Sequence, residues 1–273
     1  MVFTDKLRQA VQRNQSLVCV GLDPDPALMP VPEVFDFNRA IIDATADLVC
    51  AYKPNLAFYE ALGVEGLRAL EKTIDHVPHG IPVIGDAKRG DIGNTARAYA
   101  RALFETFGFD AATVNPYLGH DSVEPFLEYS DRMVFLLCRT SNAGAADFQS
   151  LALWSPDLEC RQQPLFRAVA AKALEWNSGH GNVGLVVGAT DPQDLADVRA
   201  LCPDMLLLVP GIGAQGGDLE LAVRHGVDAS GRGAIFNSSR QVIYASEGSD
   251  FAEAARRAAD NLRRSINSLL LPG

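Results

Sequence analysis

The chain has 273 residues, of which 48% are hydrophobic, and it carries 24 basic against 34 acidic side chains, a formal net charge of −10. This length and hydrophobic content allow a large buried core, as one barrel or as two smaller domains, and argue against a disordered chain. The excess of acidic residues argues against a general nucleic-acid surface or an anionic-membrane surface, because long-range repulsion opposes both.

The N-terminal segment carries charges throughout its first thirteen residues and has no apolar stretch that could serve as a signal core. No later run approaches the roughly 20 apolar residues of a membrane span. The five cysteines are odd in number and show no CxxC spacing, so we expect buried free thiols in a reducing compartment rather than a disulfide framework. We therefore expect a cytoplasmic protein without a membrane or nucleic-acid partner.

Eight short apolar runs recur along the chain, each bounded by turn residues. They predict buried parallel strands, because they are almost continuously apolar rather than alternating. In chain order the predicted strands are 17–22, 49–53, 82–87, 111–115, 133–139, 183–187, 205–209 and 234–237.

Segments with helical periodicity lie between these runs and after the last one, at 36–47, 63–75, 95–107, 165–176, 191–200, 219–225 and 251–270. Since each parallel crossover needs a helix, the alternation predicts an α/β fold, a single (β/α)8 TIM barrel that occupies residues 1–273. A doubly wound open sheet is the alternative. The longest irregular piece, at about 142–164, would rise over the carboxyl-terminal face of a barrel, so we interpret it as a lid.

The most informative stretch is GDAKRGDIGNT, at 85–95. With the two-residue period of a strand, Asp86 and Lys88 project to the same side. Asp91 follows at the start of the next predicted helix, and Thr95 lies one helical turn further on the same face. The stretch therefore places a lysine between carboxylates at the end of a predicted strand.

This arrangement has chemical consequences for Lys88. Flanking carboxylates raise the pKa of an amine, whereas a Schiff-base lysine needs a lowered pKa. We interpret Lys88 as an ammonium kept for electrostatic or proton-donor work, with Lys53 as a second cation that helps to keep the carboxylates ionised. Such a set suits a reaction in which a carboxylate leaves and negative charge develops on carbon. The alternative is a surface salt-bridge ladder at the start of a helix.

Two further loops predict a phosphate site. PGIGAQGGD, at 210–218, follows the seventh predicted strand, and its glycines let backbone N–H groups approach an anion. NSSR, at 237–240, follows the eighth strand and starts a helix with a guanidinium attached. These are the loops that usually hold phosphate in such barrels. Other polar residues at predicted strand ends, among them Asp23, Asn115 and 139–141, would face the same mouth.

No metal is expected, because the five histidines show neither HxxxH nor HxH spacing and no Cys/His cluster accompanies them. His120 is the histidine nearest to the proposed mouth, and we expect a structural or loop role for it.

The motifs resemble those of a known family, the orotidine 5′-phosphate decarboxylases, and in particular its longer bacterial branch. The resemblance covers nearly the whole chain. It lies in VGLDPDP at 20–26, YKPNLAFYEALG at 52–63, DAKRGDIGNTA at 86–96, TVNPYLGHDSVEPF at 113–126, RTSN at 139–142, GLVVGAT at 184–190, PGIGAQGGD and GRGAIFNSSR.

The resemblance implies a decarboxylation of orotidine 5′-phosphate to uridine 5′-phosphate in pyrimidine biosynthesis, without a metal or another cofactor. Lys53, Asp86, Lys88 and Asp91 would form the charged catalytic tetrad, with Lys88 as proton donor to the pyrimidine carbon. The resemblance also implies a homodimer, in which Asp91 and Thr95 reach the neighbouring subunit's site.

The same resemblance implies a set of substrate ligands. Asp23 would bind a ribose hydroxyl, Ser141 the pyrimidine, and Gln215 with Arg240 the phosphate. These positions agree with the phosphate loops expected from the residues alone.

Two other functions stay open. A Mg²⁺-dependent sugar-phosphate decarboxylase or synthase of the same architecture would share the Asp86 and Lys88 pair, and resistance to a chelator separates it from the first interpretation. A non-catalytic barrel that binds a nucleotide or serves as a scaffold has no reason to keep all four charges of the tetrad.

Overall fold

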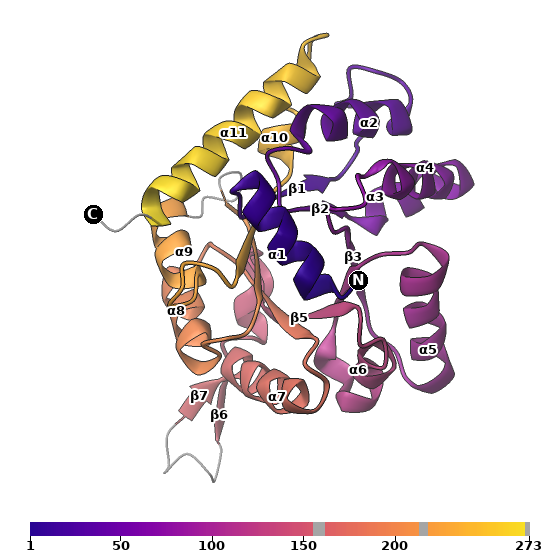
Figure 1. Cartoon of the computed structure of the whole chain (residues 1–273). Helices are drawn as coiled ribbons and strands as arrows, with labels where there is room; N and C mark the ends of the chain where they lie inside the picture. Colours follow the sequence, from indigo (N-terminus) through magenta and orange to yellow (C-terminus); the bar gives the residue numbers. More distant parts are fainter. Residues whose placement is uncertain (155–161, 213–217, 271–273) are drawn as a thin grey trace.

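In the computed structural model of the chain, which describes residues 1–154, 162–212 and 218–270, eight parallel strands form a nearly closed barrel surrounded by helices (Figure 1). The barrel strands are β1 (Val18–Leu22), β2 (Ala51–Pro54), β3 (Ile84–Arg89), β4 (Ala111–Val114), β5 (Met133–Arg139), β8 (Val183–Val187), β9 (Leu207–Pro210) and β10 (Ala234–Ser238).

The strands are hydrogen-bonded in the order β2-β1-β10-β9-β8-β5-β4-β3. Two parallel bridges, Tyr52 to Val83 and Asn55 to Asp86, join the end strands β2 and β3. Each of the eight predicted strands overlaps one of these strands. The prediction of a (β/α)8 barrel is therefore confirmed, and the alternative of an open sheet is wrong.

The helices lie around the barrel as the alternation predicts (Figure 1). They are α1 (Phe3–Asn14), α2 (Val34–Thr45), α3 (Leu56–Glu60), α4 (Gly63–His76), α5 (Gly93–Arg101), α6 (His120–Leu127), α7 (Leu165–His180), α8 (Pro192–Leu201), α9 (Leu219–Gly226), α10 (Arg240–Ile243) and α11 (Phe251–Leu270). The predicted helix at 95–107 is α5 followed by a π-helical turn, Ala102–Thr106.

Two parts of the chain differ from the expectation. Helices α1, α3 and α6 were not predicted, since α1 lies in a strongly charged segment, α3 has only five residues and α6 contains Pro125. The piece at 142–164 is not irregular throughout, because it contains a 3₁₀ turn, Ala143–Asp147, and an antiparallel hairpin of β6 (Ala152–Trp154) and β7 (Gln162–Pro164).

Alternating side chains of the strands face two different cores. On β1, Val18, Val20 and Leu22 pack outward under the helices, whereas Cys19 belongs to the apolar cluster inside the barrel. Phe3 and Leu7 of α1 complete that inner cluster. Figure 1 shows α1 crossing one end of the barrel.

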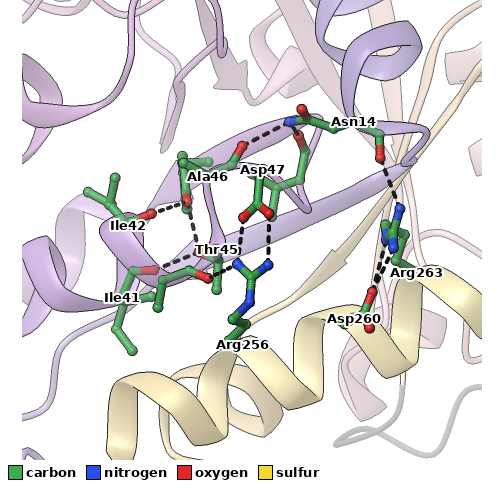
Figure 2. A network of polar contacts seen from close by, with 12 residues as sticks. Asn14, Ile41, Ile42, Thr45, Ala46, Asp47, Arg256, Asp260 and Arg263 are labelled. Atoms are coloured by element: carbon green, nitrogen blue, oxygen red, sulfur yellow. Dashed lines mark hydrogen bonds and ion pairs between the residues drawn. The ribbon is translucent and has the colours of Figure 1, made fainter.

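A polar network fixes the C-terminal end of α1 (Figure 2). The buried amide of Asn14 donates to the carbonyls of Ala46 and Val49, at 2.8 and 2.7 Å. From α11, Arg263 donates to the Asn14 carbonyl at 3.3 Å and Arg256 pairs with Asp47 at 2.6 Å. The N-terminal helix is thereby tied to both neighbouring helices, α2 and α11.

Cys19, Cys50, Cys138 and Cys202 are free and buried, as expected, and Cys160 lies outside the described residues. Burial raises the pKa of the Cys19 thiol to about 12, which keeps it unreactive. Nowhere in the described part of the chain does a helix combine the length and the apolar character needed to cross a bilayer.

Candidate active site

The carboxyl-terminal ends of the strands surround a pocket of about 730 Å³, at the end of the barrel opposite α1. This pocket brings together six of the nine site residues predicted from the sequence. They are Asp23, Lys53, Asp86, Lys88, Ser141 and Arg240.

Asp86 lies between two ammonium groups on the wall of this pocket. Its Oδ2 is 2.7 Å from Lys53 Nζ, and its Oδ1 is 2.5 Å from Lys88 Nζ. Lys53 and Asp86 are buried, whereas the Lys88 side chain is 47% exposed. The charges therefore alternate from the interior of the barrel toward the open pocket.

The local charges outweigh the effect of burial on both buried groups. Burial would raise the pKa of Asp86, but Lys53 and Lys88 hold the pKa of this carboxyl well below its ordinary value. Burial would lower the pKa of Lys53, but Asp86 and Asp23 hold the pKa of this ammonium above its ordinary value. Both groups are thus kept charged at neutral pH.

The end of β3 is irregular at the position where it supplies these residues. Its pairing with β4 shifts register between Gly85 and Arg89, and Lys88 adopts a positive φ of 47°. Asp86 and Lys88 face the same side, as predicted, but a bulge rather than a regular pleat brings them together. Arg89 turns away, pairs with Glu60 and lies over the ring of Tyr99.

Two buried acceptor atoms of the pocket residues have no hydrogen-bond partner among the described residues. They are Oδ1 of Asp23, after β1, and Oδ1 of Asn237, on β10. The two chain segments approach closely here, since a Cβ added to Gly21 would lie 1.8 Å from Ser239 Oγ. Buried acceptors of this kind usually have a partner, so these atoms are suited to donors on a bound molecule.

The loops after β9 and β10 form the part of the pocket opposite β3. Arg240 starts α10, is exposed and forms no ion pair within the residues that the structure describes. Pro210, Gly211 and Ile212 line the pocket beside it. Position 211 favours glycine, because its φ of +93° is strained for any residue with a Cβ. Gln215 lies outside the described residues.

Comparison with known proteins assigns the chain to a family. A family model described as "Orotidine 5'-phosphate decarboxylase / HUMPS family" matches residues 16–258. The chain belongs to this family. A protein named orotidine 5'-phosphate decarboxylase from Roseiflexus castenholzii is 54% identical over 277 residues, covering 99% of each chain. Another of the same name, from Dehalococcoides mccartyi, is 51% identical over 268 residues, covering 98% of each.

Solved structures agree with this assignment to the orotidine 5′-phosphate decarboxylase / HUMPS family. The structure of Leishmania donovani OMP decarboxylase is 43% identical, covers 99% of both chains and has a TM-score of 0.87. The similarity thus extends over the whole barrel and is not confined to the charged motif.

Asp91 and Thr95, the remaining predicted site residues of this family member, do not line the pocket. Asp91 accepts a hydrogen bond from the backbone N–H of Ile92 at 2.8 Å, and Thr95 is exposed on α5. Ile92, next to Asp91, and Tyr117, in the 3₁₀ turn that follows β4, expose 56% and 78% of their surface. Within one chain, therefore, the predicted tetrad is not assembled completely.

Several polar residues of the pocket were not named as site residues from the sequence, among them three that lie on or next to a barrel strand. Asn55 follows β2, Thr113 lies on β4 and Asn237 lies on β10. Thr113 could have been noticed as the one hydroxyl within the predicted strand 111–115. Asn237 was identified only as part of the NSSR loop at 237–240 and was given no role of its own.

Other strand-end residues turn out to serve the scaffold. Arg139 pairs with Asp194 at 2.5 Å, and Asn115 accepts the N–H of Tyr117 at the start of a 3₁₀ turn. His120 begins α6 and packs on Trp176, with ring centroids 5.2 Å apart. In the part of the chain that the structure describes, no group of three or more His, Cys, Asp or Glu side chains is placed to hold a metal ion.

Proposed function

We propose that this protein is an orotidine 5′-phosphate decarboxylase, which converts orotidine 5′-phosphate into uridine 5′-phosphate and CO₂. We place the reaction in pyrimidine biosynthesis in the cytoplasm and expect it to need no metal or other cofactor. The observation that carries the proposal is the chain of charges Lys53, Asp86 and Lys88 on the wall of a pocket that also contains Arg240. The names of the relatives support the same activity.

In the proposed mechanism, the substrate carboxylate lies beside the ionised Asp86 and is destabilised by repulsion. The bond between C6 and the carboxyl carbon breaks, CO₂ leaves, and the electron pair stays on C6. The Lys88 ammonium stabilises this negative charge and donates its proton to C6. Lys53 keeps Asp86 ionised throughout, because it pairs with the other carboxylate oxygen at 2.7 Å.

The rest of the substrate would extend across the barrel mouth. We assign the ribose hydroxyls to Asp23, whose buried Oδ1 is suited to accept a hydrogen bond. Ser141 would contact the pyrimidine, and Arg240 with Gln215 would bind the phosphate. Binding energy from the distant phosphate can then stabilise the transition state at the pyrimidine.

We further propose that the enzyme works as a homodimer in which Asp91 and Thr95 complete the neighbouring subunit's site. Their position outside their own pocket and next to the exposed Ile92 supports this arrangement. A mixture of Lys88→Ala and Asp91→Ala protein should regain activity, because a mixed dimer contains one intact site. A mixture as inactive as its two components, after subunit exchange has been verified, would contradict the shared site.

The interpretation of residues 142–164 as a lid stays a prediction. The base of this segment contacts the pocket, since Gln149 exchanges hydrogen bonds of 2.8 Å with the backbone N–H and the hydroxyl of Thr140. Residues 155–161 lie outside the described part.

The activity is tested directly by the loss of orotate-ring absorbance when purified protein meets orotidine 5′-phosphate in EDTA. We expect full turnover in the chelator. Activity that EDTA abolishes and Mg²⁺ restores would favour a metal-dependent enzyme of the same architecture, and no turnover with or without Mg²⁺ would overturn the proposal.

A further inference from the structure

We propose that Thr113 is a positioning residue of this site, whose single hydroxyl sets both the Asp86 carboxylate and the backbone that carries Lys88. The inference deepens the proposed decarboxylase function and rests on it. Thr113 lies on β4, is 1% exposed and lines the pocket.

The two hydrogen bonds of the Thr113 hydroxyl have fixed directions. Its Oγ1 accepts from the backbone N–H of Lys88 at 3.0 Å and donates to Oδ1 of Asp86 at 3.0 Å. A backbone N–H can only donate and an ionised carboxylate can only accept, so the one hydroxyl proton must point to Asp86. The hydroxyl therefore links a residue of β4 to both charged residues of β3.

The bulge in β3 explains why a side chain is needed at this position. Gly85 pairs with Ala112 and Arg89 with Val114, so Thr113 faces the three residues between them. This shift interrupts the strand pairing at Lys88, whose φ of 47° is unusual for a residue other than glycine. The Thr113 hydroxyl takes the Lys88 N–H in place of a backbone carbonyl and thereby holds the unusual conformation.

The contacts close a ring around the proposed proton donor. Oδ1 of Asp86 receives both the Thr113 hydroxyl and the Lys88 ammonium, while the Lys88 N–H returns to Thr113. The ammonium end of Lys88 has Asp86 as its ion-pair partner, and its side chain is otherwise half exposed to the pocket. Loss of the hydroxyl would remove a hydrogen bond from the Asp86 carboxylate and one from the Lys88 backbone at the same time. Small displacements of reacting groups strongly lower the rate of a reaction.

The test compares Thr113→Val, which keeps the β-branched shape but lacks the hydroxyl, with Thr113→Ser, which keeps the hydroxyl. Thr73→Val is the matched control. Thr73 on α4 is also 1% exposed, donates to the Ala69 carbonyl at 2.7 Å and accepts from Asn38 at 3.1 Å, but it does not line the pocket. The four measurements are kcat with orotidine 5′-phosphate, KM, competitive inhibition by uridine 5′-phosphate, and the melting temperature.

We expect Thr113→Val to lower kcat about 10- to 100-fold, because a hydrogen bond to a charged group is lost and the donor is no longer held in place. Its inhibition constant for uridine 5′-phosphate should change less than about threefold. The product lacks the carboxyl group that would lie beside Asp86 and Lys88, so its binding depends less on how these two residues are positioned. Thr113→Ser should recover most of kcat. Thr73→Val should lower only the melting temperature.

A native kcat in Thr113→Val would overturn the inference, as would an equal loss in Thr113→Ser or a comparable loss of kcat in Thr73→Val. Failure of the proposed function is distinguishable from these outcomes, because then the native protein itself would not consume orotidine 5′-phosphate.

Discussion

The two ends of the barrel use ion pairs in different ways. At the amino-terminal end, Asp110 accepts from Lys6 of α1 and from the backbone N–H of Val83, at 2.8 and 2.9 Å, and lies 3.6 Å from Arg132. These contacts tie α1 to the strands, above an interior filled by apolar side chains. At the carboxyl-terminal end, Asp86 and its two lysines tie no helix to the barrel and face an open pocket.

This difference separates charges that hold the fold from charges that we propose serve a ligand. Asp110 has partners for both carboxylate oxygens. In the pocket, by contrast, the carboxylate of Asp23 keeps a buried oxygen, Oδ1, without a partner in the described residues. A pocket that concentrates like and unlike charges beside a carboxylate oxygen without a partner is typical of a functional centre, where stability is given up for chemistry.

Lys88→Ala is expected to have the largest effect on activity, and it tests whether the charges at the carboxyl-terminal end serve the reaction rather than the fold. Removal of the proposed proton donor should lower kcat by at least about 10⁴-fold. The fold should survive, because the Lys88 side chain is 47% exposed and ties no helix to the barrel. Steady-state turnover measures the loss of kcat, and a thermal unfolding curve shows whether the fold survives. Near-native turnover would exclude Lys88 as the donor.

The opposite effect is expected at the other end from Phe3→Ala. Phe3 is buried inside the barrel end and packs edge-on against Phe135, with centroids 6.0 Å apart. Its truncation should lower the free energy of unfolding by about 3–5 kcal/mol and leave kcat per folded molecule unchanged. Denaturant titration measures the first quantity. An unchanged midpoint would mean that α1 is not part of the cooperative fold.

A smaller, pH-dependent effect is expected from Asp86→Asn, which leaves Lys53 buried without its charged partner. At pH 7 the loss of stability should be about 3 kcal/mol. Because the pKa of Asp86 is lowered in the folded state, its contribution is present above the unfolded value of about 4 and is lost as the pH falls below it. The difference between native and Asp86→Asn should therefore shrink between pH 5 and about pH 2 in denaturant titrations. A difference that stays constant over this range would contradict the lowered pKa.

Much of the fold was predictable because buried parallel strands are almost continuously apolar. The eight runs identified the barrel strands, whereas α1 was missed because its apolar residues Phe3, Leu7 and Ala10 are embedded among charges. The polar ends of the strands also predicted the pocket, since parallel strands of a barrel bring their carboxyl ends to one mouth.

The parts of the site that the sequence did not predict depend on contacts between strands. The bulge in β3 arises from its pairing with β4, and the role of Thr113 follows only from that pairing. The orphan acceptor of Asn237 likewise depends on the packing of β10 beside β1. The residue pattern drew attention to Asp91 and Thr95, but their role in a neighbouring subunit's site came from the resemblance alone, because nothing in one chain brings them to the pocket.

The most direct test of the account is the rate of orotidine 5′-phosphate turnover per folded molecule, measured side by side for the native protein, Lys88→Ala and Phe3→Ala. We predict a native rate for Phe3→Ala and almost none for Lys88→Ala. A rate that survives the loss of the Lys88 ammonium but falls when the far end of the barrel is loosened would contradict the account.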